Sequence, residues 1–147
     1  MHNIPFYRQE KEWTCGAACV RMVCASLGVK KSEREFARLL RVQRKKGTLH
    51  KEIPMLLEKY HFQYVVGRKG VIADLRRLLK QRYRCMVGYW LIEHKCPHYA
   101  VVQKIGSTKV YLLDPWCGPH HSYSLKEFKK IWYDGEGEEG WFVGIKK

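Results

Sequence analysis

The sequence predicts one α+β domain, with a helical half at about 1–60 packed against an antiparallel sheet in a second half at about 61–147. Apolar residues recur at helical spacing in the first half, whereas short apolar segments bounded by turn residues fill the second. A length of 147 residues supports one core and is too short for two ordinary domains. We expect a cleft between the two halves.

Three helices are predicted in the first half. Gly28 is a typical C-terminal cap for the first of them. Ser32 and Glu35 form the capping-box pattern that opens the second, and Pro54 fits the first turn of the third. A basic loop separates the second helix from the third. The helices are expected at 16–27, 32–42 and 51–60, and the basic loop at 43–47.

The second half alternates short strands with two more helices. Gly106 and Ser107 are turn residues between two apolar runs, which predicts a hairpin. An acidic loop at 134–139 precedes the last strand. The strands are expected at 62–66, 85–92, 98–105, 110–113 and 141–145, and the helices at 71–80 and 125–133.

Cys15 stands where a loop becomes the first helix, with the amide side chain of Gln9 six residues upstream. A helix N-terminus has unpartnered backbone N–H groups and a partial positive charge. A thiol at this position ionises more easily, and the thiolate is the nucleophile. The same N–H groups can hold an oxyanion, with Gln9 as a second donor. This pattern predicts a thiol nucleophile.

His98 begins one strand and Asp114 ends the next, so a hairpin would place both at the same end of neighbouring strands. A base and the carboxylate that orients it need this pairing. Because Pro115 ends the strand directly after Asp114, we expect the carboxylate to face the cleft. The tryptophans Trp13 and Trp116 flank the predicted nucleophile and aspartate, and are expected either to wall the cleft or to pack in the core.

These residues resemble the motifs of the C39 peptidases, a papain-like family that cuts bacteriocin and peptide-pheromone precursors after a double-glycine leader. The likeness covers nearly the whole chain. It implies a papain-like fold, with Cys15 as nucleophile, His98 as general base and acid, Asp114 as the orienting residue and Gln9 in the oxyanion hole. The matching segments are Gln9, Cys15-Gly16-Ala17-Ala18-Cys19-Val20, His98-Tyr99 and Asp114-Pro115.

The resemblance implies a cysteine peptidase that cleaves after Gly in a leader peptide, with a membrane transporter as a partner. Well-known members are fused to ABC transporters, whereas this sequence has neither a membrane span nor a phosphate-binding loop, so we expect a stand-alone form. Thr14 precedes the nucleophile where many members have Asp. The same residues would also serve amidase or transferase chemistry.

Three alternatives remain open. The same scaffold can serve as a non-catalytic adaptor that binds a leader peptide or a protein. A basic chain can bind nucleic acid, although no nucleic-acid module is recognisable and no specific nucleic acid is expected. Two clusters of His and Cys could hold zinc, but they lack a clean Cys-x2-Cys pair, so we expect no metal and no cofactor. The clusters are His94-x-Cys96-x-His98 and Cys117-x2-His120-His121.

The formal net charge of +14 is large for this length and predicts an acidic peptide or protein substrate. Solvated surface faces are the alternative explanation for the same charge. No apolar signal segment opens the sequence, so we expect a cytoplasmic protein whose six cysteines are thiols. Cys19 and Cys24 are expected in the core, and His50 and His61 on the surface.

Overall fold

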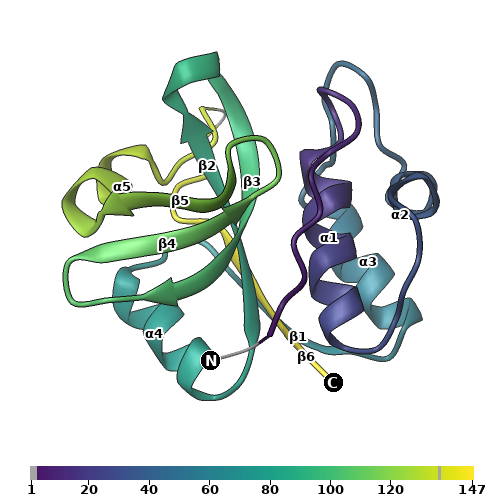
Figure 1. The fold of residues 1–147 in the computed structure, drawn as a ribbon, viewed down its shortest axis with the longest axis horizontal. Coiled ribbons are helices and arrows are strands. Elements are labelled where there is room, and N and C mark those ends of the chain that lie inside the picture. The colour runs from purple at the N-terminus through teal and green to yellow at the C-terminus, as the bar shows by residue number, and fades with distance from the viewer. Residues whose placement is uncertain (1–2, 136) are drawn as a thin grey trace.

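A six-stranded antiparallel sheet in the order β1-β6-β2-β3-β4-β5 forms the centre of the protein (Figure 1). The computed structural model describes residues 3–135 and 137–147. The first two positions of the predicted domain and Glu136 of the predicted acidic loop lie outside the described residues. The strands are β1 (Gln63–Gly67), β2 (Arg84–Leu91), β3 (Cys96–Ile105), β4 (Lys109–Asp114), β5 (Gly118–Ser124) and β6 (Phe142–Lys146).

Helices cover both faces of this sheet. In Figure 1, α1, α2 and α3 lie together on one side of it, and α4 and α5 lie on the other. The predicted α+β class is confirmed, with the first three helices before the sheet in the chain. The helices are α1 (Cys15–Ser26), α2 (Glu33–Leu39), α3 (Glu52–Lys59), α4 (Ile72–Lys80) and α5 (Leu125–Ile131), with a 3-10 turn at Ile92–His94.

Two hydrophobic cores lie on opposite faces of the sheet. Met86 and Val101 pack toward α1, α2 and α3, whereas the neighbouring residues Val87 and Val102 pack toward α4 and α5. This follows from the alternation of side chains along a strand. Because β2 and β3 are buried on both faces, they hold the residues between them and α1 in fixed positions.

The first helix is almost entirely buried, and its eight fully enclosed residues include the predicted core thiols Cys19 and Cys24. It packs against α2 and β3. Gly28 follows the helix with φ +93°, a conformation that glycine adopts without strain, as its predicted role as a cap requires. α1 therefore begins at a fixed point opposite the start of β3.

Of the strands in the described residues, β5 is the one that the sequence did not predict. Its sequence, Gly-Pro-His-His-Ser-Tyr-Ser, has no apolar alternation, because β5 pairs only with β4 at the edge of the sheet and is largely half-buried. The second helix also ends earlier than predicted, since Arg41 adopts a left-handed conformation with φ 55°. No helix in the described ranges is long and apolar enough to cross a membrane.

Candidate active site

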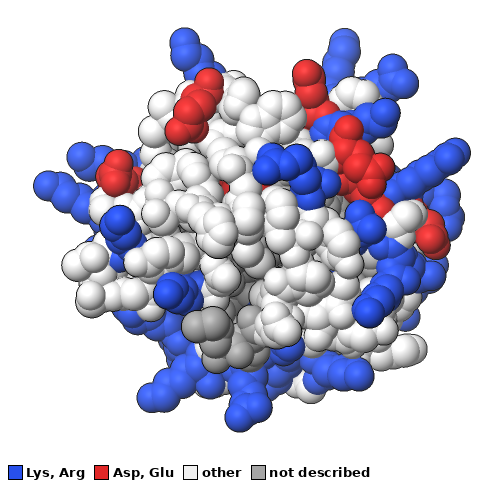
Figure 2. Space-filling model, in the orientation of Figure 1, with Lys and Arg blue, Asp and Glu red and all other residues white. Residues whose placement is uncertain are grey.

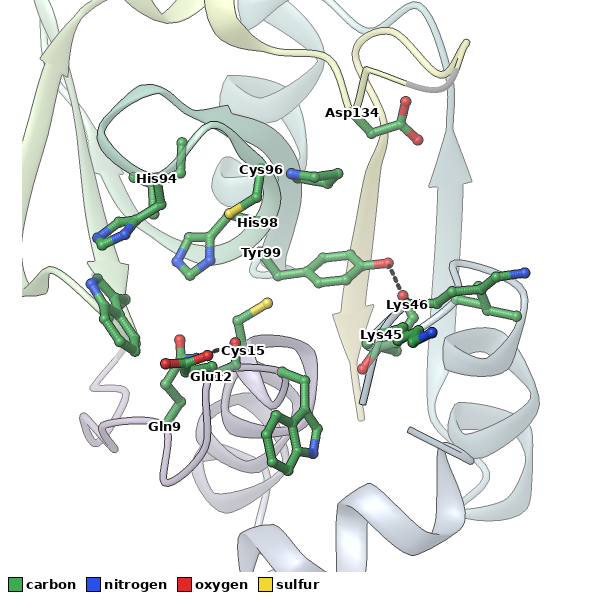
Figure 3. A pocket seen from close by; sticks show the side chains of 18 of the residues that line it. Gln9, Glu12, Cys15, Lys45, Lys46, His94, Cys96, His98, Tyr99 and Asp134 are labelled. Carbon is green, nitrogen blue, oxygen red and sulfur yellow. Dashed lines mark hydrogen bonds between the residues drawn. The ribbon is translucent and has the colours of Figure 1, made fainter. Parts of the chain in front are cut away.

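A groove of about 810 Å³ lies between the start of α1 and strands β2 and β3, and Cys15 lines it (Figure 3). Cys15 is the first residue of α1, and its side chain is partly exposed. Trp13 and Trp116 both line the groove, so of the two expected positions, the cleft wall and the core, the structure has the cleft wall. The groove thus takes side chains from the helical part of the chain and from the sheet.

No side chain caps the N-terminus of α1. The hydroxyl of Thr14 instead exchanges hydrogen bonds with the backbone of Lys11, accepting from its N–H at 3.0 Å and donating to its carbonyl at 2.9 Å. The first turn also contains no acidic residue. The backbone N–H groups at the start of the helix, including that of Cys15, therefore remain available to an anion in the groove.

His98 and Asp114 are joined across the ends of β3 and β4, with 2.8 Å between Nε2 of the imidazole and Oδ1 of the carboxylate. This is the neighbouring-strand pairing that the sequence predicted. The other ring nitrogen is left for Cys15, which lies close enough to His98 to raise the pKa of its imidazole. In Figure 3 the side chains of Cys15 and His98 point into the same space.

Asp114 is completely buried behind His98 and does not line the groove. The expectation that its carboxylate faces the cleft is wrong, because the turn that follows folds back over it. Its Oδ1 accepts from the backbone N–H groups of Trp116 and Cys117, each at 2.9 Å, as well as from His98. Its Oδ2 accepts from the hydroxyl of Tyr89, a buried residue on β2 that the sequence did not single out.

The surroundings of the pair favour a charged imidazole and a charged carboxylate. Burial lowers the pKa of His98, but attraction to Cys15 and hydrogen bonds to Asp114 and Cys15 outweigh it and raise that pKa to about 10. Burial raises the pKa of Asp114, yet the bonds to His98, Tyr89 and Cys117 hold it at about 2. A buried imidazolium beside Cys15 stabilises negative charge on the sulfur.

Gln9 lines the groove beside Cys15, as its spacing in the sequence predicted, and is 8% exposed. The segment that carries it is tied to the sheet, because the N–H of Gln9 donates to the carbonyl of Pro115 at 3.0 Å. Its amide nitrogen donates to the carbonyls of Lys11 at 2.8 Å and Glu12 at 3.1 Å. The side-chain oxygen is buried and has no hydrogen-bond partner among the described residues.

Thr48 packs directly against the start of α1. A Cβ on Gly16 would lie 2.6 Å from the Cβ of Thr48, so no other residue fits at position 16 unless this loop moves. Thr48 is 7% exposed and lines the groove together with Cys15 and Gln9. No local sequence pattern pointed to Thr48, because its contact with Gly16 depends on how the loop folds back.

A second histidine closes the groove wall beyond Tyr99. The hydroxyl of Tyr99 donates to the carbonyl of Thr48 at 3.1 Å and shares a hydrogen bond of 2.5 Å with Nδ1 of His50. Nε2 of His50 lies 3.3 Å from the carboxylate of Asp134, and its ring stacks on Trp141. Burial lowers the pKa of His50, and the pull of Asp134 offsets this only in part.

The expectation that His50 lies on the surface is therefore wrong. The sequence places this residue just before a helix, where histidines are usually solvated. Its partners Tyr99, Asp134 and Trp141 are distant in the chain, so local pattern carried no sign of the network.

The remaining thiols are poor candidates for nucleophiles or metal ligands. Burial raises the pKa of Cys19 and Cys24, and burial followed by repulsion from Asp114 raises the pKa of Cys117 to about 12. Within the described part of the chain, Asp114, Cys117 and His121 bring ligand atoms within 4.8 Å of one another. Three ligands are fewer than the four of a structural zinc site, and Asp114 is already committed to four hydrogen bonds.

Sequence comparison identifies one family. The family model described as "Peptidase C39 family" matches residues 3–135, which is most of the chain. No curated protein matches at a significant level.

Solved structures share the fold over almost the full length. The peptidase domain of Streptococcus ComA, a bi-functional ABC transporter involved in a quorum-sensing pathway, has 17% identity and a TM-score of 0.79, covering 97% of this chain and 98% of that domain. A double glycine motif protease from an AMS/PCAT transporter, in complex with a leader peptide, has 17% identity and a TM-score of 0.74, with 99% and 92% covered. A C39-like peptidase from Bacillus anthracis has 12% identity and a TM-score of 0.77, with 100% and 96% covered.

Proposed function

Because the chain belongs to the Peptidase C39 family, we propose that it hydrolyses peptide bonds with Cys15 as the nucleophile, His98 as general acid and base, and Asp114 as the orienting residue. The observation that carries the proposal is the chain of contacts from Cys15 through His98 to the buried carboxylate of Asp114. It has the nucleophile, base and orienting group that thiol catalysis needs.

In the proposed reaction, the sulfur of Cys15 attacks the carbonyl carbon of the scissile peptide bond. The oxygen that becomes negative is held by the backbone N–H of Cys15 and by the amide of Gln9. For this, the Gln9 amide nitrogen turns one hydrogen from the carbonyl of Glu12, the longer of its two contacts, toward the oxyanion. The imidazolium of His98 then donates its proton to the leaving amine.

The resulting thioester is released by water. The neutral imidazole of His98 takes a proton from the water molecule, which attacks the same carbonyl carbon and regenerates the thiolate. Asp114 keeps Nε2 of His98 protonated and directed away from Cys15 throughout, so the other ring nitrogen carries the proton transfers. Helical and sheet residues act together here, so we propose that the chain forms one catalytic domain.

The proposed substrate is a peptide cleaved after Gly in a leader sequence. Thr48 and Tyr99 line the groove, and Thr48 packs directly against Gly16, the residue that follows Cys15. Small residues next to the cleaved bond suit a wall packed this closely against the nucleophile's neighbour. One structural relative is a double glycine motif protease with a bound leader peptide. This protease and the ComA peptidase domain both come from transporters, so a transporter partner is part of the proposal.

The test is hydrolysis of a peptide with a double-glycine site by the wild-type chain and by Cys15→Ala. Cys24→Ala is the matched control, since Cys24 lies on the same helix as Cys15 but is buried in the core and does not line the groove. We expect Cys15→Ala to lose turnover and Cys24→Ala to keep it. Mass spectrometry of the quenched wild-type reaction should show an acyl group on Cys15. A Cys15→Ala variant that cleaves at the original rate would refute the proposal.

A further inference from the structure

If the proposed hydrolysis takes place, the position of His98 shows which end of the groove holds the amine half of the substrate and which end holds the acyl half. His98 must reach the leaving amine while the acyl carbon is bonded to the sulfur of Cys15. In Figure 3, His98 lies on the side of Cys15 that also holds His94 and Gln9. The amine half of the substrate therefore lies toward His94, and the acyl half extends the other way, past Tyr99.

Three consecutive cations stand at this acyl end. Arg44, Lys45 and Lys46 are exposed at the tip of a tight turn and line the groove. The turn is closed by two backbone hydrogen bonds between Gln43 and Gly47, of 3.0 and 2.7 Å. Figure 3 shows Lys45 and Lys46 beyond Tyr99, on the side of Cys15 away from His98. The turn thus holds its charges at the edge of the substrate path.

No described carboxylate pairs with these cations. The ion pairs in the described residues involve other side chains, and Arg44 instead lies over the ring of Trp13, with 5.3 Å to the centroid. Asp134, also at this end of the groove, has its carboxylate 3.3 Å from His50 and accepts from the N–H of Glu138. The local charge at the acyl end is therefore positive, in a protein whose net charge is already +14.

Figure 2 shows one face of the protein, in the orientation of Figure 1. Lys and Arg lie around much of the outline of that face, whereas its centre is mostly uncharged. Scattered exposed cations of that kind are solvated and have little selectivity. The turn at residues 44–46 differs because it is a run of like charges on the wall of the groove itself. An acidic side chain brought there by a substrate would meet two or three cations at once.

We infer that the turn at residues 44–46 is a specificity site for an acidic side chain on the acyl side of the cleaved bond, with Lys45 and Lys46 as its main contacts. The inference rests on the proposed hydrolysis for its direction along the groove. Arg44 is held over Trp13, so the two lysines are the mobile cations that a passing carboxylate can pair with.

The experiment uses a series of double-glycine peptides in which one Glu is moved stepwise along the acyl side, each with a Gln twin. The variant is Lys45→Gln with Lys46→Gln. The matched control is Lys129→Gln with Lys130→Gln, an exposed pair on α5, on the opposite face of the sheet, which removes the same charge. Two quantities are measured: kcat/KM for each peptide, and the Kd of each peptide for the Cys15→Ala protein with and without the lysine changes.

At one position of Glu we expect the wild-type chain to prefer the Glu peptide over its Gln twin by about three- to tenfold, the size of one or two exposed ion pairs. The preference should vanish in the Lys45/Lys46 variant, persist in the control, and shrink as the ionic strength rises.

Measuring both kcat/KM and Kd distinguishes a failure of the specificity site from a failure of the proposed hydrolysis. Hydrolysis without any preference for Glu, or equal loss of preference in both double variants, would overturn the specificity site and leave the peptidase proposal standing. Absence of hydrolysis together with a Glu preference in Kd that depends on Lys45 and Lys46 would refute the proposed reaction and support the site as a binding surface. Neither hydrolysis nor selective binding would overturn both.

Discussion

The Cβ of Thr48 lies 2.6 Å from the place where a Cβ on Gly16 would begin, so the loop before α3 and the start of α1 fit together only because residue 16 is glycine. The glycine that follows the proposed nucleophile therefore has a packing role. It lets the backbone of Thr48, and the Tyr99 hydroxyl bonded to it, approach Cys15 closely. The width of the groove beside Cys15 is set by this contact.

We expect Gly16→Ala to reduce kcat/KM strongly, by about tenfold or more, because a methyl group at this position displaces either Thr48 or the first turn of α1. The fold should survive, since the rest of α1 is untouched. Steady-state hydrolysis and far-UV circular dichroism check the two parts. Full activity in Gly16→Ala would show that the loop moves without cost.

A second change at Thr48 sharpens this test. Thr48→Ala removes the Oγ1 and Cγ2 atoms but keeps the Cβ at 2.6 Å, whereas Thr48→Gly removes all three contacts. In the Gly16→Ala background, Thr48→Gly should therefore restore activity in part and Thr48→Ala should not. Equal behaviour of the two double variants would mean that the clash is not the cause of the loss.

Gln9→Ala should lower kcat by about 10²–10³ with a smaller effect on KM, the cost of losing one oxyanion-hole donor. Gln9→Glu is the companion variant, because it keeps the size of the side chain and replaces the amide by an acceptor. Both should be equally slow if the amide acts as a donor in the transition state. A Gln9→Glu variant with wild-type kcat would exclude this role and leave Gln9 as a structural part of its loop.

The pH profile of kcat/KM should lose activity on the alkaline side near pH 10, where His98 loses its proton. Asp114→Asn removes the negative charge that helps to hold this proton, so the alkaline limb should shift to lower pH. Activity at neutral pH should fall steeply, by up to about 10⁴, because the amide no longer stabilises the imidazolium of His98 and can favour its other tautomer. An unchanged alkaline limb would mean that another group controls it.

His50→Phe should destabilise the protein by about 1–2 kcal/mol, since it removes the hydrogen bonds to Tyr99 and Asp134 while a ring can still stack on Trp141. The groove wall should loosen, so KM should rise more than kcat falls. Urea denaturation and steady-state kinetics measure the two effects. Tyr99→Phe removes the same Tyr99–His50 hydrogen bond from its other partner, so the two changes should be less than additive. Full additivity would show that the two residues act separately.

The element types could largely be predicted from local patterns. Capping residues such as Ser32, glycine after α1 and apolar alternation are properties of neighbouring residues, and the structure has the predicted helices with ends shifted by a few residues. Strand β5 could not be found in this way. It is held by hydrogen bonds to one neighbour, and its half-exposed position puts no apolar requirement on its residues.

The residues of the candidate site also fall into those that a local sequence pattern predicts and those that it does not. Cys15, His98 and Asp114 carry signals because each stands at or near an element boundary, and Gln9 carries one through its spacing from Cys15. Residues that act through packing were not predictable: Tyr89 supports Asp114 from another strand, and His50 meets partners far along the chain. The burial of Asp114 was also hidden, because it depends on the turn that follows Pro115.

The proposed sulfur and the proposed base come from separate parts of the chain, one from α1 and the other from β3. Refolding therefore has to dock the helices onto the sheet before Cys15 and His98 can meet. The rate at which a small haloacetamide alkylates Cys15 during refolding therefore reports on this docking. Before the helices dock, Cys15 should react at the rate of an ordinary thiol, and after docking it should react faster.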